Sequence, residues 1–274
     1  MRSPEPILVV DLFPLERAAL LDLLESVDPP AWERETVCAG WAVRDIVAHL
    51  VGDDLGLVSR GRDAYLPTRR DDEDLLSFVN RQNAEWVQAA RRLSPAVLRT
   101  LLRIGARETQ RHFESLDPFE IGGPVSWATG GEPAPIWLDL ARELTERWHH
   151  QQQIRDAVGA HPMMDPRIVR PVLATFAYAI PRTFRAVQRP PGTVVTLLVS
   201  GESGGAWSIV REGDVWHLYV GRPTSVQAEV ELTQDDFWRL VTKGITTAVA
   251  EERGRLAGDL ELARRLLTTV AIIA

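Results

Sequence analysis

The spacing of apolar residues divides the chain into a helical first half and a mixed second half. Up to residue 158, apolar positions recur at intervals of three and four, which is the spacing of one face of an α-helix. Leu20, Leu24 and Val27 belong to one such stripe, which ends at Asp28 before two prolines. Gly159 is expected to end the last helix of this half. The pattern predicts five helices, over residues 14–27, 42–63, 75–93, 94–116 and 135–158.

Beyond residue 190, short β-branched runs separated by glycine replace the helical spacing, as is typical of strands. We predict strands over residues 193–201, 206–214, 215–221 and 226–232, with a turn at 212–214. Helices are expected over 164–188, where Pro171 and Pro181 can break or kink the helix, and over 233–244 and 258–273. Residues 117–133, rich in Gly and Pro, are predicted as a loop. The predicted fold class is α+β, with a helical domain over residues 1–162 and a small α/β domain over residues 163–274.

Composition and charge narrow the class of protein. The 274 residues carry a net charge of −7, and the basic residues are scattered, whereas a nucleic-acid-binding face needs clustered ones. No apolar run approaches the roughly 18 residues that a membrane helix requires. The first residues show no signal-peptide pattern. Cys38 is the only cysteine, so no internal disulfide can form. We therefore expect a cytoplasmic protein without nucleic-acid or membrane partners.

Two polar side chains of the fifth helix are spaced to hold a metal ion. Glu146 and His150 lie four residues apart, which places them on one helix face with Cβ atoms about 5–6 Å apart. A carboxylate and an imidazole so placed can bind the same divalent cation. His149 is a rival ligand, but it points roughly 100° away from His150, so both can hardly bind one ion. The alternative interpretation is a polar helix face without any metal.

His49, in the middle of the second predicted helix, is the candidate third ligand. Bundle metal sites are built from inward side chains of facing helices. Three protein ligands with an open fourth position are typical of catalytic zinc. Asp45 and Asp53, four residues to either side, are either outer hydrogen-bond partners of the imidazole or ordinary surface charges.

The remaining histidines are weaker candidates. His112 is expected on a solvated helix face, His161 in the boundary loop, and His217 packed in a strand.

Two stretches of the chain carry a resemblance to a known family. They are residues 32–60, WERETVCAGWAVRDIVAHLVGDDLGLVSR, and residues 137–159, WLDLARELTERWHHQQQIRDAVG. Together they resemble the maleylpyruvate isomerase N-terminal family of DinB-like four-helix bundles, many of which use the thiol mycothiol. The resemblance implies a divalent metal, usually zinc, bound by His49, Glu146 and His150. Many members carry Asp where this chain has Gln153, which hydrogen-bonds but supplies no charge.

In its order of predicted strands and helices, the C-terminal half is similar to the small α/β domain of that family, which resembles sterol carrier proteins. This similarity transfers no site residue, so catalytic and cofactor-binding residues stay unassigned.

The function implied is a divalent-metal-dependent thiol transferase or isomerase, with mycothiol as cosubstrate and a small electrophile as substrate. Ligands of this kind also suit nickel or iron. The alternatives are a non-catalytic metal- or ligand-binding protein and a metal-hydroxide hydrolase or lyase. Cys38 could serve as a nucleophile, but no histidine stands beside it in a recognisable motif, so a packed free thiol is the preferred interpretation. The protein is expected to be a monomer or a homodimer.

Overall fold

The computed structural model describes residues 1–272. The chain forms two compact units, each discontinuous in sequence. The helical unit consists of Val10–Asp117 and Glu146–Met163, and the sheet unit consists of Met1–Val9, Pro118–Thr145 and the described residues from Met164 on. The α+β class is confirmed, with a helical N-terminal region and a small C-terminal sheet.

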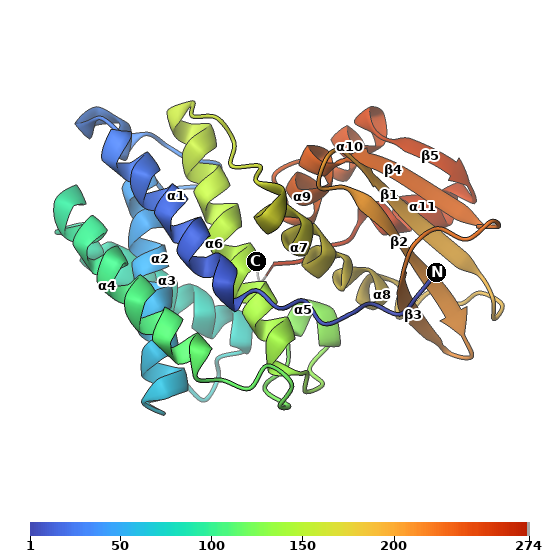
Figure 1. The fold of residues 1–274 in the computed structure, drawn as a ribbon, viewed down its shortest axis with the longest axis horizontal. Helices are drawn as coiled ribbons and strands as arrows, with labels where there is room; N and C mark the ends of the chain where they lie inside the picture. The colour runs from blue at the N-terminus through green and yellow to red at the C-terminus, as the bar shows by residue number, and fades with distance from the viewer. Residues whose placement is uncertain (273–274) are drawn as a thin grey trace. The chain divides into compact units, whose positions relative to one another are not determined.

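The helical unit is built from the elements that the apolar spacing predicts. Its long helices are α1 (Phe13–Ser26), α2 (Val43–Leu57), α3 (Leu75–Ala90), α4 (Pro95–Glu114) and the second half of α6 (Ile136–Val158). Short helical turns are η1 (Val10–Leu12), η2 (Pro29–Glu33) and the π-helical η3 (Val58–Arg62). In Figure 1, α1, α2 and α4 run alongside one another, and α3 packs against α2.

Local chemistry fixes the ends of these helices. Asp74 accepts a hydrogen bond from the backbone N–H of Ser77 at the start of α3, and Ser94 accepts one from Val97 at the start of α4. Gly159 follows α6 with φ of 72°, the left-handed conformation in which helices commonly end. The apolar stripes meet in one core, formed by residues such as Leu20, Leu24, Val43, Ile46, Val47, Leu50, Leu98, Leu102 and Ile154.

Up to residue 272, the sheet unit contains five strands, one more than predicted. They are β1 (Val194–Ser200), β2 (Gly205–Glu212), β3 (Val215–Val220), β4 (Ala228–Thr233) and β5 (Arg255–Gly258). Their order is β3-β2-β1-β4-β5, with β1 and β4 parallel and the other pairs antiparallel. Gly213, with φ of 55°, lies in the predicted turn between β2 and β3.

Besides the first half of α6, the described helices of the sheet unit are α5 (Ser126–Thr129), α7 (Pro166–Ala177), α8 (Ala179–Phe184), α9 (Gln234–Val241), α10 (Thr247–Arg253) and α11 (Leu260–Leu267). Helices α8, α9 and α11 contact the sheet. The helical stretch predicted over residues 164–188 is divided at Tyr178, while Pro171 lies inside α7 and Pro181 inside α8 without breaking either helix. The predicted loop at 117–133 contains α5, and α10 with β5 was not predicted.

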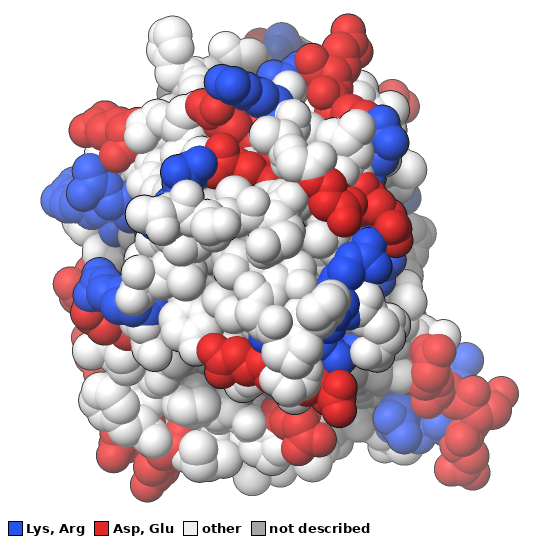
Figure 2. Space-filling view, turned by 90° about the vertical axis from the view of Figure 1, so that its right-hand side faces the viewer, with Lys and Arg blue, Asp and Glu red and all other residues white. Residues whose placement is uncertain are grey.

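The face drawn in Figure 2 carries basic and acidic side chains interspersed, rather than one basic field. No helix within residues 1–272 is long and apolar enough to cross a membrane.

Candidate metal centre

The three predicted ligands come together inside the helical unit. His49 lies in the middle of α2, and Glu146 and His150 lie one turn apart on α6. One ligand atom from each lies within 4.8 Å of the others. Within residues 1–272, this is the one cluster of at least three His, Cys, Asp or Glu side chains that meets this criterion.

Two distances at the centre of the cluster are compatible with three groups around one cation. Glu146 Oε1 lies 2.9 Å from His150 Nε2 and 3.4 Å from His49 Nε2. Ligands bound tetrahedrally to zinc at 2.0–2.1 Å are about 3.3 Å apart. Two imidazoles and one carboxylate are also a donor set that zinc and similar divalent ions accept. The side chains present therefore fit a divalent metal.

The charges of the cluster suit the same interpretation. Burial lowers the pKa of His49, but Asp53 and Glu146 outweigh this effect and raise it to about 8. Burial favours the neutral form of Glu146, yet His150 and His49 hold its pKa well below its ordinary value. The side chain of Glu146 is 26% exposed, whereas both imidazoles are buried. The cluster thus combines buried imidazoles with an ionised carboxylate that reaches solvent.

Gln153 orients the two adjacent histidines. Its Oε1 lies 2.7 Å from His150 Nδ1, and its Nε2 lies 2.7 Å from His149 Nε2. An amide oxygen only accepts, so Nδ1 of His150 carries a proton, and Nε2 of the same ring faces the carboxylate of Glu146. The amide nitrogen donates to His149, and burial lowers the pKa of His149 to about 3. His149 is therefore neutral and bound to Gln153 rather than part of the cluster.

Asp45 and Asp53, which flank His49 in the sequence, have different contacts. Asp45 forms an ion pair with Arg91 and accepts a hydrogen bond from the backbone N–H of Ala42 at the start of α2. Asp53 Oδ2 lies 3.2 Å from Nε2 of His49, the nitrogen that also faces Glu146. Asp45 thus stabilises the helix, and Asp53 lies on the ligand side of the imidazole rather than behind it.

Cys38 adjoins the cluster without the features of a nucleophile. Its Sγ donates to Gln153 Oε1 at 3.3 Å. Burial, with a smaller contribution from Glu146, raises the pKa of the Cys38 thiol. A raised pKa disfavours the thiolate, which is the reactive form. The structure agrees with the interpretation of Cys38 as a packed thiol.

Trp41 and Trp148 differ in their relation to the cluster. The Trp41 ring lies 5.2 Å from the His49 ring, while Trp148 is fully buried and donates to the carbonyl of Met163. Trp148 is therefore a core residue.

Two predictions about the other histidines were wrong. His112 is buried beside Phe113, because α4 turns this position toward the interior. His217 is exposed, because its side chain lies on the outward side of β3 while that of Trp216 is buried. His161 is exposed in the predicted loop.

Sequence reasoning missed a buried polar group next to the metal-binding face of α6. Asp54 of α2 pairs with Arg17 of α1 at 2.9 Å and with Arg147 of α6 at 2.8 Å. Glu16 accepts a hydrogen bond from Gln151 at 2.8 Å. The signal was present, because Arg147 and Gln151 occupy positions in the apolar stripe of Leu140, Leu144 and Ile154.

The contact between Gln153 and His150 leads to a first prediction. Gln153→Leu is expected to weaken zinc affinity about 10–100-fold, the usual cost of losing the hydrogen bond behind a metal-bound histidine. Gln153→Glu, which keeps an acceptor for Nδ1, is expected to retain the affinity. Competition with a chromophoric chelator measures both, and Gln88→Leu on the exposed side of α3 is the control. Equal affinities of the leucine variant and the unchanged protein would contradict this role.

The raised pKa of His49 leads to a second prediction, on pH dependence. Because the folded-state pKa is about 8, above the ordinary 6.5, the metal-free protein holds a proton on His49 at neutral pH. A cation must displace this proton. If the proton on His49 alone determines the pH dependence, zinc affinity is expected to rise about tenfold per pH unit below pH 8. Above pH 8 the affinity is expected to become independent of pH. An affinity unchanged between pH 6 and 8 would contradict the assignment.

Comparisons with known proteins agree with this picture. The sequence profile described as the mycothiol maleylpyruvate isomerase N-terminal domain matches residues 13–155. The match includes all three residues of the cluster. No curated protein sequence matches the chain.

Two crystal structures share the fold. The mycothiol-dependent maleylpyruvate isomerase is 15% identical with a TM-score of 0.54, and the match covers 85% of this chain and 87% of that one. A histidine-to-alanine mutant of the mycothiol-dependent maleylpyruvate isomerase is also 15% identical, with a TM-score of 0.55 and coverage of 90% and 91%. At this identity the likeness concerns the fold alone.

The profile match extends over more than half of the chain, and it covers α1 to α4 and nearly all of α6. It confirms the predicted family and, with it, the prediction that the protein is an enzyme. The chain belongs to the mycothiol maleylpyruvate isomerase N-terminal domain family.

Proposed function

We propose that this enzyme is a mycothiol-dependent isomerase or thiol transferase that acts on a small electrophile and requires a divalent metal, zinc in the first instance. His49, Glu146 and His150 would hold the metal. The observation that carries the proposal is the convergence of these three side chains, from two helices, within 4.8 Å. Family membership supplies the thiol and the class of reaction.

A bound divalent cation would lower the pKa of a coordinated thiol, so that thiolate is present at neutral pH. The chain's own residues prepare the site for this. Gln153 accepts from Nδ1 of His150, so that Nε2 would be the nitrogen that binds the metal, and the exposed edge of Glu146 leaves one side accessible. Because Cys38 has a raised pKa, the chain offers no competing thiolate at that position.

The chemistry follows from the thiolate. Its sulfur adds to the electron-poor carbon of an activated cis double bond, which becomes a single bond and can rotate. Elimination of the same thiolate restores the double bond in the trans form, so the thiol is not consumed. In a transferase the thiolate instead displaces a leaving group and stays attached as a thioether.

A kinetic assay with maleylpyruvate tests the proposal. The purified protein, loaded with zinc, is expected to isomerise maleylpyruvate in the presence of mycothiol and not in its absence. Removing the metal with a chelator is expected to abolish turnover, and adding zinc back is expected to restore it.

The outcomes distinguish the alternatives. Product formed without any thiol would indicate hydrolase or lyase chemistry. Stoichiometric metal binding without turnover of maleylpyruvate or of other activated alkenes and halides would indicate a binding protein. Full activity in the demonstrably metal-free protein would remove the metal from the proposal.

Other features of the chain stay predictions. These are the likeness of the helical unit to DinB bundles and of the C-terminal part to sterol carrier proteins, the domain boundary after residue 162, the cytoplasmic location, and the monomeric or homodimeric state. The mixed sheet with helices packed against it supports the sterol carrier likeness.

A further inference from the structure

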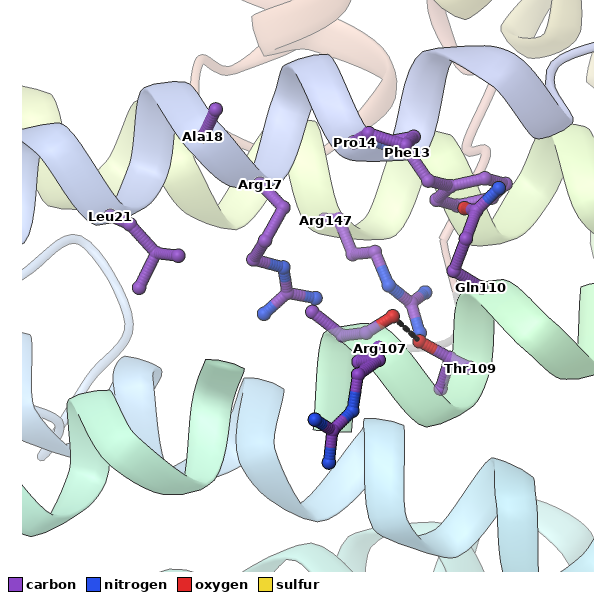
Figure 3. A pocket seen from close by; sticks show the side chains of 10 residues that line it. Phe13, Pro14, Arg17, Ala18, Leu21, Arg107, Thr109, Gln110 and Arg147 are labelled. Atoms are coloured by element: carbon purple, nitrogen blue, oxygen red, sulfur yellow. Dashed lines mark hydrogen bonds between the residues drawn. The ribbon is translucent and has the colours of Figure 1, made fainter. Parts of the chain in front are cut away.

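Arg182, in the sheet unit, is a partly buried arginine without a counter-charge. Two buried arginines of the helical unit, Arg17 and Arg147, line the cavity drawn in Figure 3, and both pair with Asp54. Arg182 lies in the last turn of α8, is only partly exposed, and forms no side-chain hydrogen bond or ion pair within residues 1–272. A charged side chain withdrawn from water is usually paired, so an external anion can supply the missing partner.

The backbone after α5 makes room for the guanidinium group of Arg182. Gly130 follows α5 with φ of 70°, in the left-handed region that favours glycine. A Cβ atom added to Gly130 would overlap Nη1 of Arg182. The guanidinium group therefore lies directly against the bare backbone of Gly130. A side chain at this position would push the guanidinium group out of its place.

Tyr178 offers a second donor on the same side of the helix. It precedes Arg182 by four residues and keeps helical backbone angles, φ of −65° and ψ of −13°, so the two side chains share one face. The Tyr178 ring meets the Trp137 ring edge-on, with 5.7 Å between the ring centroids. Its hydroxyl has no hydrogen-bond partner in the described part of the chain. Burial raises the pKa of Tyr178 to about 12, so the hydroxyl keeps its proton and can donate it.

These groups define the chemistry of a ligand. A guanidinium group presents a planar fork of N–H donors that matches a carboxylate, and a hydroxyl can donate to the same anion. Glu132, the acidic residue nearest to Gly130 in the sequence, is exposed and forms no ion pair with Arg182. One unpaired guanidinium group calls for one negative charge. The partly exposed rings of Trp137 and Tyr178 supply an apolar surface against which a planar body can lie.

We propose that Arg182 and Tyr178 bind a small monocarboxylate with a planar, aromatic or unsaturated body. The guanidinium group holds the carboxylate, the Tyr178 hydroxyl donates to it, and the body lies against the Trp137 ring. All three side chains are partly exposed, so a ligand can reach them from solvent. The residues of the site belong to the sheet unit, whereas the metal cluster belongs to the helical unit, and the inference does not depend on the proposed isomerase activity.

Calorimetric titration of the full-length protein with sodium benzoate tests the inference. Benzamide is the uncharged planar analogue, and sodium acetate at equal ionic strength is the carboxylate without a ring. Saturable binding of benzoate is expected, with weaker binding of the other two. Arg182→Met and Tyr178→Phe are each expected to weaken benzoate binding at least about tenfold, the usual effect of losing a hydrogen bond to a charged group. Gly130→Ala, which keeps both donors but displaces the guanidinium group, is expected to weaken binding similarly.

The matched control is Arg255→Met, which removes an exposed arginine of β5 that likewise forms no side-chain ion pair up to residue 272. This variant is expected to bind benzoate like the unchanged protein. Tyr178→Phe keeps the ring that packs against Trp137, so its thermal unfolding is expected to stay unchanged and to separate loss of the site from loss of the fold.

Three results would overturn the proposal. The first is the absence of saturable benzoate binding. The second is binding that survives Arg182→Met or Tyr178→Phe, as it would for a carboxylate bound at the metal cluster. The third is an affinity for benzamide or acetate equal to that for benzoate, which would contradict the class of ligand.

Discussion

His49→Ala is expected to abolish turnover and to lower zinc affinity by more than about 100-fold. Loss of an outer hydrogen-bond partner alone costs about 10–100-fold, and here one of three direct ligands would be removed. Glu146 and His150 would remain, but two ligands from one helical turn do not enclose a cation. Elemental analysis of the purified variant and competition with a chelator measure the loss.

The control for this substitution is His161→Ala, which removes an exposed histidine of the same unit. It is expected to leave metal content and turnover unchanged. If the His49 variant retained stoichiometric zinc with unchanged affinity, the cluster would have to be interpreted as a set of hydrogen bonds centred on Glu146, and the proposed mechanism would lose its basis.

The second large effect is expected for a substitution of Asp54, which lowers the free energy of unfolding rather than changing the catalytic chemistry. Asp54→Asn removes the negative charge that the buried guanidinium groups of Arg17 and Arg147 share. Breaking a buried ion pair in this way typically costs about 3–5 kcal/mol. Urea denaturation followed by circular dichroism measures the loss in free energy of unfolding.

Glu25→Gln provides the comparison, because Glu25 forms an exposed ion pair with Arg103 in the same unit. Exposed pairs contribute about 0–1 kcal/mol, so this variant is expected to unfold almost as the unchanged protein does. Similar losses for Asp54→Asn and Glu25→Gln would contradict the interpretation of Asp54 as the carboxylate of a buried group of ion pairs.

The elements of the helical unit were predictable because each carries its own apolar stripe. The pairing of Glu146 with His150 was predictable for a similar reason, since both lie on one helix and four residues apart. His49 is 97 residues from Glu146, and only the packing of α2 against α6 decides that their side chains meet. Spacing alone could nominate His49, and the family resemblance strengthened the choice.

Short elements and buried polar residues escaped prediction for other reasons. Strand β5 has four residues, too few for an alternating pattern, and it exists through its pairing with β4, where Leu256 faces Val230. Gln153 was recognised as a departure from the family pattern, but its contacts with His149 and His150 depend on side-chain rotamers. Arg17, Asp54 and Arg147 were overlooked because charged residues are usually exposed.

The ion pairs of Asp54 have a consequence for synthesis of the protein. The partners lie on α1, α2 and α6, and Arg147 is 93 residues beyond Asp54. While α6 has not yet emerged from the ribosome, the nascent chain lacks both Arg147 and the helix that completes the core. The helical unit can therefore complete its interior only late in translation, and until then its apolar stripes stay accessible to chaperones.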